Sequence, residues 1–165
     1  MDLPPTLLAT TTFVLHKVGA AGRRVLAGRL ADEAGLSLWE FAALAALADF
    51  GASAQREVGD RLGLDPSDMV RLMDGLVAAG LAERDRDPAD RRRYRVSVTP
   101  SGLDALNRAR SLVEKVERET LAPLTPAERT RLRELVTKVF TGGQASTGGQ
   151  AGTGDVGEHR QGGGR

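Results

Sequence analysis

The fold is decided by residues 65–98, which read DPSDMVRLMDGLVAAGLAERDRDPADRRRYRVSV. The stretch opens with Asp65 and Pro66, an N-cap residue followed by a proline at the first helical position. Gly80 then provides a helix stop. Between these signals, four apolar residues recur at the spacing of one helix face: Met69, Leu72, Met73 and Leu76. We therefore predict a helix with one buried face.

After this helix the period of the sequence changes. Tyr94, Val96 and Val98 alternate with polar residues, which is a strand pattern, and residues 81–86 supply a second strand. Residues 87–93 between them are polar, turn-forming and rich in arginine. We predict a β-hairpin with a basic tip.

A shorter helix precedes this stretch. Ser53 is expected to cap a helix over residues 54–62, which Gly63 ends. A helix, a tight turn containing glycine and a second helix have the spacing of a helix-turn-helix unit. With the hairpin as a wing, the predicted fold is mainly α with a small β-hairpin, a winged helix-turn-helix.

Further helices are predicted on both sides of this lobe. Residues 5–32 are expected to form one long helix, and Ser37 with Glu40 forms a capping box that opens another. Two more helices are expected within residues 100–140, one opened by Thr99 as N-cap and the other by a capping box at Thr125. Their apolar stripes exceed what one small lobe can cover, so we expect the segments at about 5–32 and 100–140 to be dimerisation helices. A monomer in which they pack within one chain is the alternative.

Composition bounds the rest of the chain. Its 165 residues suffice for one domain, expected over residues 1–140, and ten of the 20 glycines fall within residues 141–165, a predicted disordered tail. The lack of cysteine and the presence of only two histidines argue against disulfides and metal sites, and no cofactor is expected. The longest apolar run, residues 41–48, is too short for a membrane span. We expect a cytoplasmic protein without membrane contact.

The detailed residues resemble the MarR-type family of transcriptional regulators. Residues 64–76 resemble the recognition helix of that family. Residues 80–84, 90–92 and 96–99 with Gly102 match its wing pattern in order and spacing. The resemblance covers roughly residues 6–140. It implies a homodimer that binds double-stranded DNA at an inverted repeat, with two recognition helices about one DNA turn apart. Regulators of this family are often released from DNA by a small effector.

The first turns of the predicted recognition helix carry the candidates for reading bases. If its apolar stripe faces the core, the opposite face presents Ser67, Asp68, Val70 and Arg71. Arg71 and Ser67 can bond guanine or phosphate, and Val70 can pack on a thymine methyl group. Asp68 either accepts a hydrogen bond from cytosine N4 or only caps the helix, and we favour the cap.

The predicted wing tip carries four arginines within residues 91–95. By resemblance, Arg92 is expected to enter a minor groove, with Arg91 and Arg93 as the next candidates for DNA contact. Asp90 is suited to brace an arginine guanidinium through a bidentate bond. The hairpin is therefore the stronger electrostatic feature, although a merely solvated basic hairpin is the alternative.

The lobe at about 53–100 contains nine arginines and nine acidic residues. DNA affinity must therefore come from the placement of charge rather than from overall positive potential. Two other classes of function stay open. One is a protein-interaction module that no longer binds DNA, which the neutral lobe and Asp68 favour. The other is an enzyme, although no nucleophile–base pair is visible.

The resemblance places an effector between the dimerisation helices and the winged lobe. The candidate ligand-binding residues are Phe13 and His16 on the first helix and Trp39 at the start of the second. The effector class expected is a small aromatic or anionic molecule. A packing role for Trp39 and a solvated or structural role for His16 are the alternatives. Without cysteine, the thiol-based peroxide sensing found in part of the family is excluded.

Overall fold

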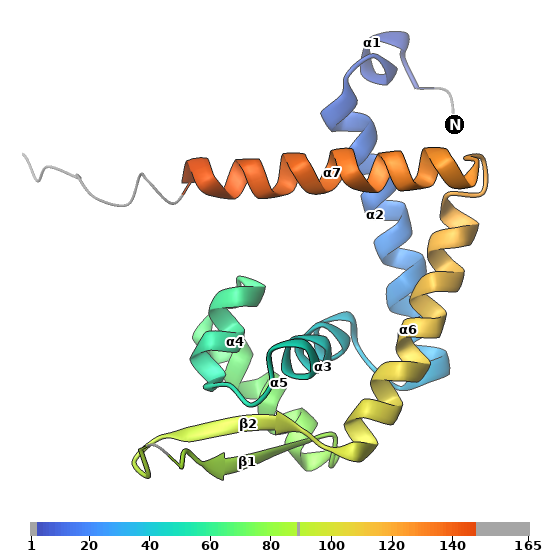
Figure 1. Ribbon diagram of the computed structural model, residues 1–165. Coiled ribbons are helices and arrows are strands. Elements are labelled where there is room, and N and C mark those ends of the chain that lie inside the picture. Colours follow the sequence, from blue (N-terminus) through green and yellow to red (C-terminus); the bar gives the residue numbers. More distant parts are fainter. Residues whose placement is uncertain (1–2, 89, 148–165) are drawn as a thin grey trace, which may run out of the picture. The chain divides into compact units, whose positions relative to one another are not determined.

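The computed structural model describes residues 3–88 and 90–147 (Figure 1). It separates into two compact units, a larger one that ends at Thr120 and a smaller one that begins at Leu121. The fold is mainly helical with one two-stranded antiparallel sheet, as predicted. Most of the segment predicted to be disordered, residues 148–165, lies outside the described residues.

The N-terminal helix is interrupted, so the prediction of one helix over residues 5–32 is wrong. The structure has a short helix α1 (Pro5–Leu8), then α2 (Thr11–Arg29), which passes into a π-helical turn η1 (Leu30–Ala34). Thr10 between α1 and α2 adopts an extended conformation, with φ −93° and ψ 97°. Its hydroxyl donates to the Thr6 carbonyl at 3.0 Å. Such local side-chain bonds compete with helix propagation, and periodicity alone does not reveal them.

Three helices form the centre of the lobe: α3 (Leu38–Phe50), α4 (Gln55–Leu62) and α5 (Pro66–Ala78). The capping box at the start of α3 is confirmed, and Gly63 ends α4 in the left-handed conformation with φ 65°. Three residues of the predicted stripe on α5 are buried, and the fourth packs against the core: Met69, Met73 and Leu76, then Leu72. The helix-turn-helix is thus present with the predicted face inward.

The start of α4 differs from the prediction, because Ser53 does not cap it. The N-cap is Ala54, whose N–H donates to the Glu57 carboxylate at 3.0 Å. Ser53 is buried, and its backbone exchanges hydrogen bonds of 3.1 and 2.9 Å with Val96 of the wing. The backbone of Ser53 pairs with Val96, 43 residues further along the chain. No residue near Ser53 in the sequence indicates this pairing.

The wing consists of β1 (Ala82–Arg86) and β2 (Tyr94–Val98), which pair in antiparallel register with Ala82 opposite Val98. Ala82 and Val96 point into the core, while most of the remaining strand residues are exposed. Figure 1 shows the hairpin beside the helix-turn-helix, with its tip at the end away from α6. One apolar side chain from each strand therefore anchors the hairpin base and leaves the tip in solvent.

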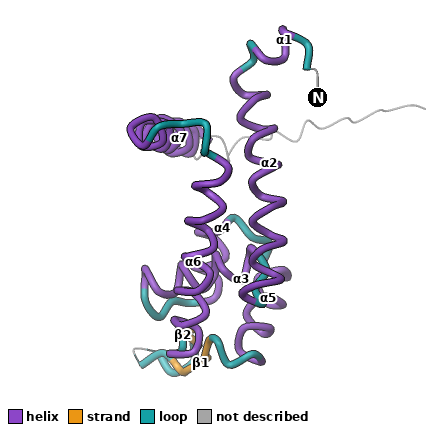
Figure 2. The backbone as a smooth tube through the Cα atoms, turned by 90° about the vertical axis from the view of Figure 1, so that its right-hand side faces the viewer, coloured by secondary structure: helices purple, strands orange, loops and turns teal. Residues whose placement is uncertain are grey.

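The helix α6 (Pro100–Thr120) begins directly after the wing and runs alongside α2 (Figure 2). The predicted N-cap is confirmed, since the Thr99 hydroxyl accepts from the Gly102 N–H at 3.0 Å. An ion pair of 2.9 Å joins Arg29 of α2 to Glu119 near the end of α6. These contacts hold α2 against α6 within the larger unit.

The smaller unit contains α7 (Pro126–Thr147). Its predicted capping box is confirmed: the Thr125 N–H donates to the Glu128 carboxylate at 2.8 Å, and the Glu128 N–H donates to the Thr125 hydroxyl at 3.4 Å. The bonds that the Thr125 N–H and the Thr125 hydroxyl donate to the carboxylate of Glu128 lower the pKa of Glu128. The helix continues past the predicted end at Phe140, into the segment expected to be disordered. Extending an existing helix costs far less free energy than nucleating a new one. The prediction from composition took no account of this and therefore ended the helix too early.

Candidate nucleic-acid interface

The N-terminus of α5 is held by Asp65, the predicted N-cap. Its carboxylate accepts from the Ser67 N–H at 2.8 Å and from the Ser67 hydroxyl at 2.6 Å. The hydroxyl and backbone bonds from Ser67 lower the pKa of Asp65 and keep it ionised. Asp65 and Ser67 therefore fix the first turn of the helix together. Ser67 is also one of the predicted DNA contacts.

The face of α5 opposite the core presents the four predicted base-reading residues in solvent: Ser67, Asp68, Val70 and Arg71. Val70 is 46% exposed although it is apolar, which makes it available to a thymine methyl group. Asp68 is not the N-cap, because Asp65 holds that position. The carboxylate of Asp68 instead forms an ion pair with Arg71, one turn further along the helix.

The wing tip is shaped by Asp90 through the backbone. Its carboxylate accepts from the Arg92 N–H at 3.0 Å, and its carbonyl accepts from the Arg93 N–H at 2.9 Å. The predicted brace between Asp90 and a guanidinium is therefore wrong, because the tight turn brings backbone N–H groups to the carboxylate first. Within residues 3–88 and 90–143, the exposed guanidinium groups of Arg91, Arg92 and Arg93 have no carboxylate partner.

Arg86 on β1 supports the wing tip, a role that the sequence analysis did not predict. The Arg86 guanidinium lies over the Tyr94 ring, 4.8 Å from its centroid, and Nη1 donates to the Arg91 carbonyl at 2.7 Å. Arg86 and Tyr94 are directly opposite in the hairpin register. This cross-strand pair could have been found from the sequence only if the register had been known.

Arg84 joins the wing to the helix-turn-helix and was also missed. Its Nη2 donates to Asp74 of α5 at 2.8 Å and to Gln55 of α4 at 3.0 Å. On the other strand, Arg95 donates to the Ala52 carbonyl in the loop before α4. Strand β1 is thus bonded to α4 and α5, and strand β2 is bonded to the loop before α4.

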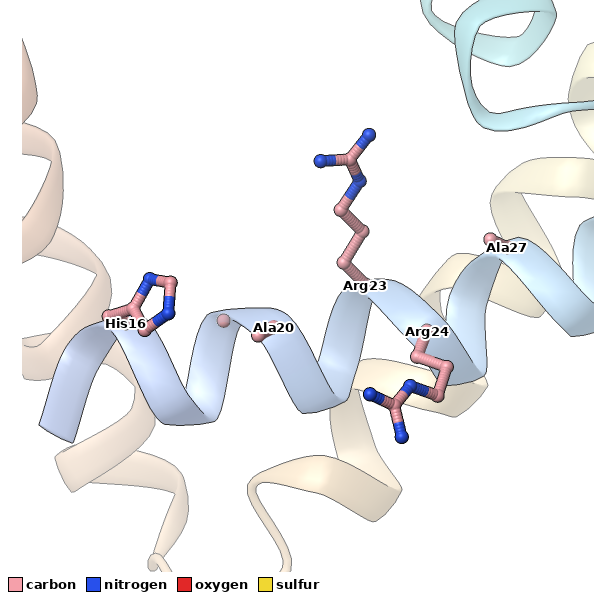
Figure 3. Close-up of a pocket in the computed structure, with 6 residues that line it drawn as sticks. His16, Ala20, Arg23, Arg24 and Ala27 are labelled. Atoms are coloured by element: carbon pink, nitrogen blue, oxygen red, sulfur yellow. The ribbon is translucent and has the colours of Figure 1, made fainter.

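The three candidate effector residues do not share a site. His16 lines a hollow of about 540 Å³ on α2, together with small and basic residues of the same helix: Gly19, Ala20, Arg23, Arg24 and Ala27. In Figure 3, the side chains of Arg23 and Arg24 leave opposite sides of α2. Phe13 is half-buried beneath the Lys17 ammonium, 5.4 Å from its ring centroid.

Trp39 lies on α3 and is 42% exposed. It lines a different hollow of about 410 Å³ whose wall includes Asp68 and Arg71 of α5. Trp39 is therefore next to the predicted DNA-reading face rather than beside His16. Tertiary packing separates residues that the sequence analysis had grouped.

The described residues contain neither a helix suited to crossing a membrane nor a cluster of metal-ligating side chains. None of their helices combines the length and the apolar character that crossing a membrane requires. No three metal-ligating side chains gather among them either.

Comparisons with known proteins agree with this geometry. The sequence profile of the MarR family matches residues 34–93. An HTH-type transcriptional regulator of Mycobacterium tuberculosis is 34% identical over 98 residues, which are 59% of this chain and 68% of that protein. The HTH-type transcriptional repressor NicR of Pseudomonas putida is 28% identical over 101 residues, covering 61% of this chain and 64% of NicR.

A solved structure shares the architecture. CouR of Rhodococcus jostii, bound to p-coumaroyl-CoA, superimposes with a TM-score of 0.69 at 25% sequence identity. The match covers 81% of this chain and 93% of CouR. The predicted winged helix with flanking helices is therefore an arrangement that a solved structure also has.

Proposed function

Since the chain belongs to the MarR family of transcriptional regulators, we propose that it represses transcription by binding an inverted-repeat operator as a homodimer. The observation that carries this proposal is the wing tip, where Arg91, Arg92 and Arg93 are exposed and have no carboxylate partner among the described residues. The hairpin that carries them is bonded to α5 through Arg84 and Asp74. A helix N-terminus suits the major groove, and an arginine-tipped hairpin suits the adjacent minor groove.

Within this proposal, the two elements have different tasks. Arg92 enters the minor groove while Arg91 and Arg93 neutralise phosphates, and these contacts carry little sequence information. Arg71 and Val70 on α5 read base edges in the major groove. Asp90 acts indirectly, because its bonds to the Arg92 and Arg93 backbone shape the tip that presents the guanidinium groups.

Dimerisation is proposed for the helices that flank the lobe, at about 5–32 and 100–140. Apolar side chains are exposed on α2, among them Leu15, Val18 and Val25. A second copy would cover them and would set two recognition helices one DNA turn apart. The repressor NicR, a relative by sequence, supports repression as the outcome.

We further propose a small aromatic or anionic effector that releases the DNA. The hollow at His16 supports an anionic group, because Arg23 and Arg24 border it and neither has an acidic partner among residues 3–88 and 90–143. CouR was solved with p-coumaroyl-CoA, which contains both an aromatic ring and phosphates. Phe13 on α2 and Trp39 on α3 remain predicted ligand contacts at separate places in the larger unit.

Replacing arginines tests the proposal directly. Arg92→Ala is expected to weaken binding to many duplex sequences alike, whereas Arg71→Ala also relaxes the base preference. Both are measured by gel-shift titration against a randomised duplex library. Arg108→Ala, which removes an exposed arginine of α6, is the charge-matched control and should leave both properties unchanged.

The same titrations separate the other classes of function. Unchanged DNA binding after the joint change of Arg92 and Arg93 to alanine would refute the wing assignment and favour a protein-interaction module. The relatives named above are transcriptional regulators and not enzymes, which leaves DNA binding as the activity to measure.

A further inference from the structure

The first turn of α5 carries two carboxylates, and only one is needed to form the helix. The Asp65 carboxylate caps the helix by accepting from the Ser67 N–H and from the Ser67 hydroxyl. The side chain of Asp68 is 53% exposed. Asp68 does not cap the helix, because Asp65 is the N-cap. A carboxylate near DNA phosphates lowers DNA affinity through repulsion. The presence of Asp68 on the exposed face of α5 that carries the predicted base-reading residues, called the reading face below, therefore needs another explanation.

Asp68 is paired with Arg71, which is the only arginine on the reading face of α5. Other basic residues of the lobe are matched in the same way, such as Arg56 with Asp60 at 3.8 Å. The wing arginines at 91–93 differ, since no carboxylate of the described residues pairs with them. The recognition helix therefore presents a neutral pair of a donor and an acceptor, while the wing presents net positive charge.

We propose that Asp68 and Arg71 act as one specificity-determining unit, an inference that rests on the proposed DNA-binding function. Arg71 donates to O6 and N7 of a guanine, and Asp68 accepts from the exocyclic amine of a cytosine or adenine at a neighbouring base pair. One helical turn separates the two side chains, so both reach the groove from the same face of α5. Val70, between them in the sequence, contacts the groove wall.

Asp68 contributes mainly by rejecting wrong sequences. Opposite an acceptor such as thymine O4 or guanine O6, its carboxylate would be repelled and would lose water without gaining a donor. At non-operator DNA, it also keeps Arg71 neutralised and so weakens attraction to phosphates. Specificity then arises from a penalty at wrong sites as much as from attraction at the right one.

The test compares the full chain with Asp68→Ala and Asp68→Asn on a randomised duplex library, reading affinity for each sequence. Asp68→Ala is expected to lose about tenfold discrimination at one base pair per half-site and to bind non-operator DNA more tightly. Asp68→Asn is expected to shift that position toward adenine, because an amide can bond adenine N6 and N7 together. Thermal midpoints of both variants verify that the exposed position tolerates the change.

Asp60→Asn is the matched control, because Asp60 is also an exposed carboxylate paired with an arginine of the lobe but lies on α4. It should raise affinity for all sequences alike and leave the base preference intact. An unchanged base preference in Asp68→Ala, with wild-type protein bound normally, would overturn this inference alone. A wild-type chain that bound no duplex would remove the proposed function and this inference together.

Discussion

Gly102 marks the place where the wing and α6 come into direct backbone contact. A Cβ atom at this position would lie 2.0 Å from the Leu81 carbonyl oxygen and 2.8 Å from Val98 Cγ2. The neighbouring Thr99 fastens the same junction, since its N–H donates to the Leu81 carbonyl at 3.1 Å and its hydroxyl donates to Gly80 at 2.7 Å. The bond from the Thr99 N–H fixes the Leu81 carbonyl in place, and the hydroxyl bond fixes the neighbouring peptide.

Gly102→Ala is therefore expected to destabilise the fold by about 1–3 kcal/mol through overpacking. Gly75→Ala is the control, because its Cβ would meet only Glu40 Oε1 at 3.9 Å within a helix. That change should be neutral or stabilise by up to about 1 kcal/mol. Urea unfolding followed by circular dichroism measures both, and equal stability of the two variants would contradict the close approach at Gly102.

The hairpin behaves as an extension of the helix-turn-helix, because its two strands are tied to different parts of it. Arg84 on β1 reaches α4 and α5, and Val96 on β2 pairs with the backbone of Ser53 before α4. Arg86 and Tyr94 then stiffen the segment that leads to the tip. The position of the tip relative to α5 is thereby set before DNA is bound, which reduces the entropy lost on binding.

Arg84→Met keeps the aliphatic stem and removes the bonds to Asp74 and Gln55. With the ion pair partly exposed, at 34% and 56% of the side chains, we expect a loss of about 1 kcal/mol in operator binding, or about fivefold in affinity. Arg110→Met is the control, since Arg110 forms an interhelical pair of 3.2 Å with Asp49 at similar exposure.

The control variant should change stability to a similar degree and leave DNA affinity unaltered. Fluorescence anisotropy with a labelled operator measures affinity, and thermal unfolding measures stability. Equal affinity losses in the Arg84 and Arg110 variants would indicate a general loss of folding rather than a misplaced wing.

At the scale of the molecule, the smaller unit carries exposed apolar side chains. On α7, four such side chains follow one another along the helix: Leu135, Val136, Val139 and Phe140. Val139 is 71% exposed and Phe140 is 65% exposed. Exposed apolar surface of this extent favours association, and the proposed symmetric dimer would cover it.

Phe140→Asp is expected to shift the full chain from dimer toward monomer, because a charge would be buried in the proposed interface. Operator affinity should fall with it, since two linked half-sites bind more tightly than one. Thr137→Asp places the same charge on α7 outside the apolar stripe and serves as the control. Sedimentation velocity measures the oligomeric state, and a monomeric wild-type chain would contradict the proposed dimer.

Local chemistry determined much of this protein from sequence alone. Helix starts at Ser37, Asp65, Thr99 and Thr125 could be predicted because a cap and the N–H groups it satisfies lie within three residues. The buried and exposed faces of α5 followed from the 3.6-residue period. The basic hairpin tip followed from alternation on either side of a polar turn.

Only the tertiary structure decided how these elements are joined. Arg84 meets partners 10 and 29 residues away, and the backbone of Ser53 pairs across 43 residues, so neither leaves a local signal. The same holds for His16 and Trp39, which the family resemblance had grouped and which packing places in separate hollows. Contacts between distant segments depend on where whole helices come to rest, and that is set by the collective burial of the core rather than by any neighbouring residue.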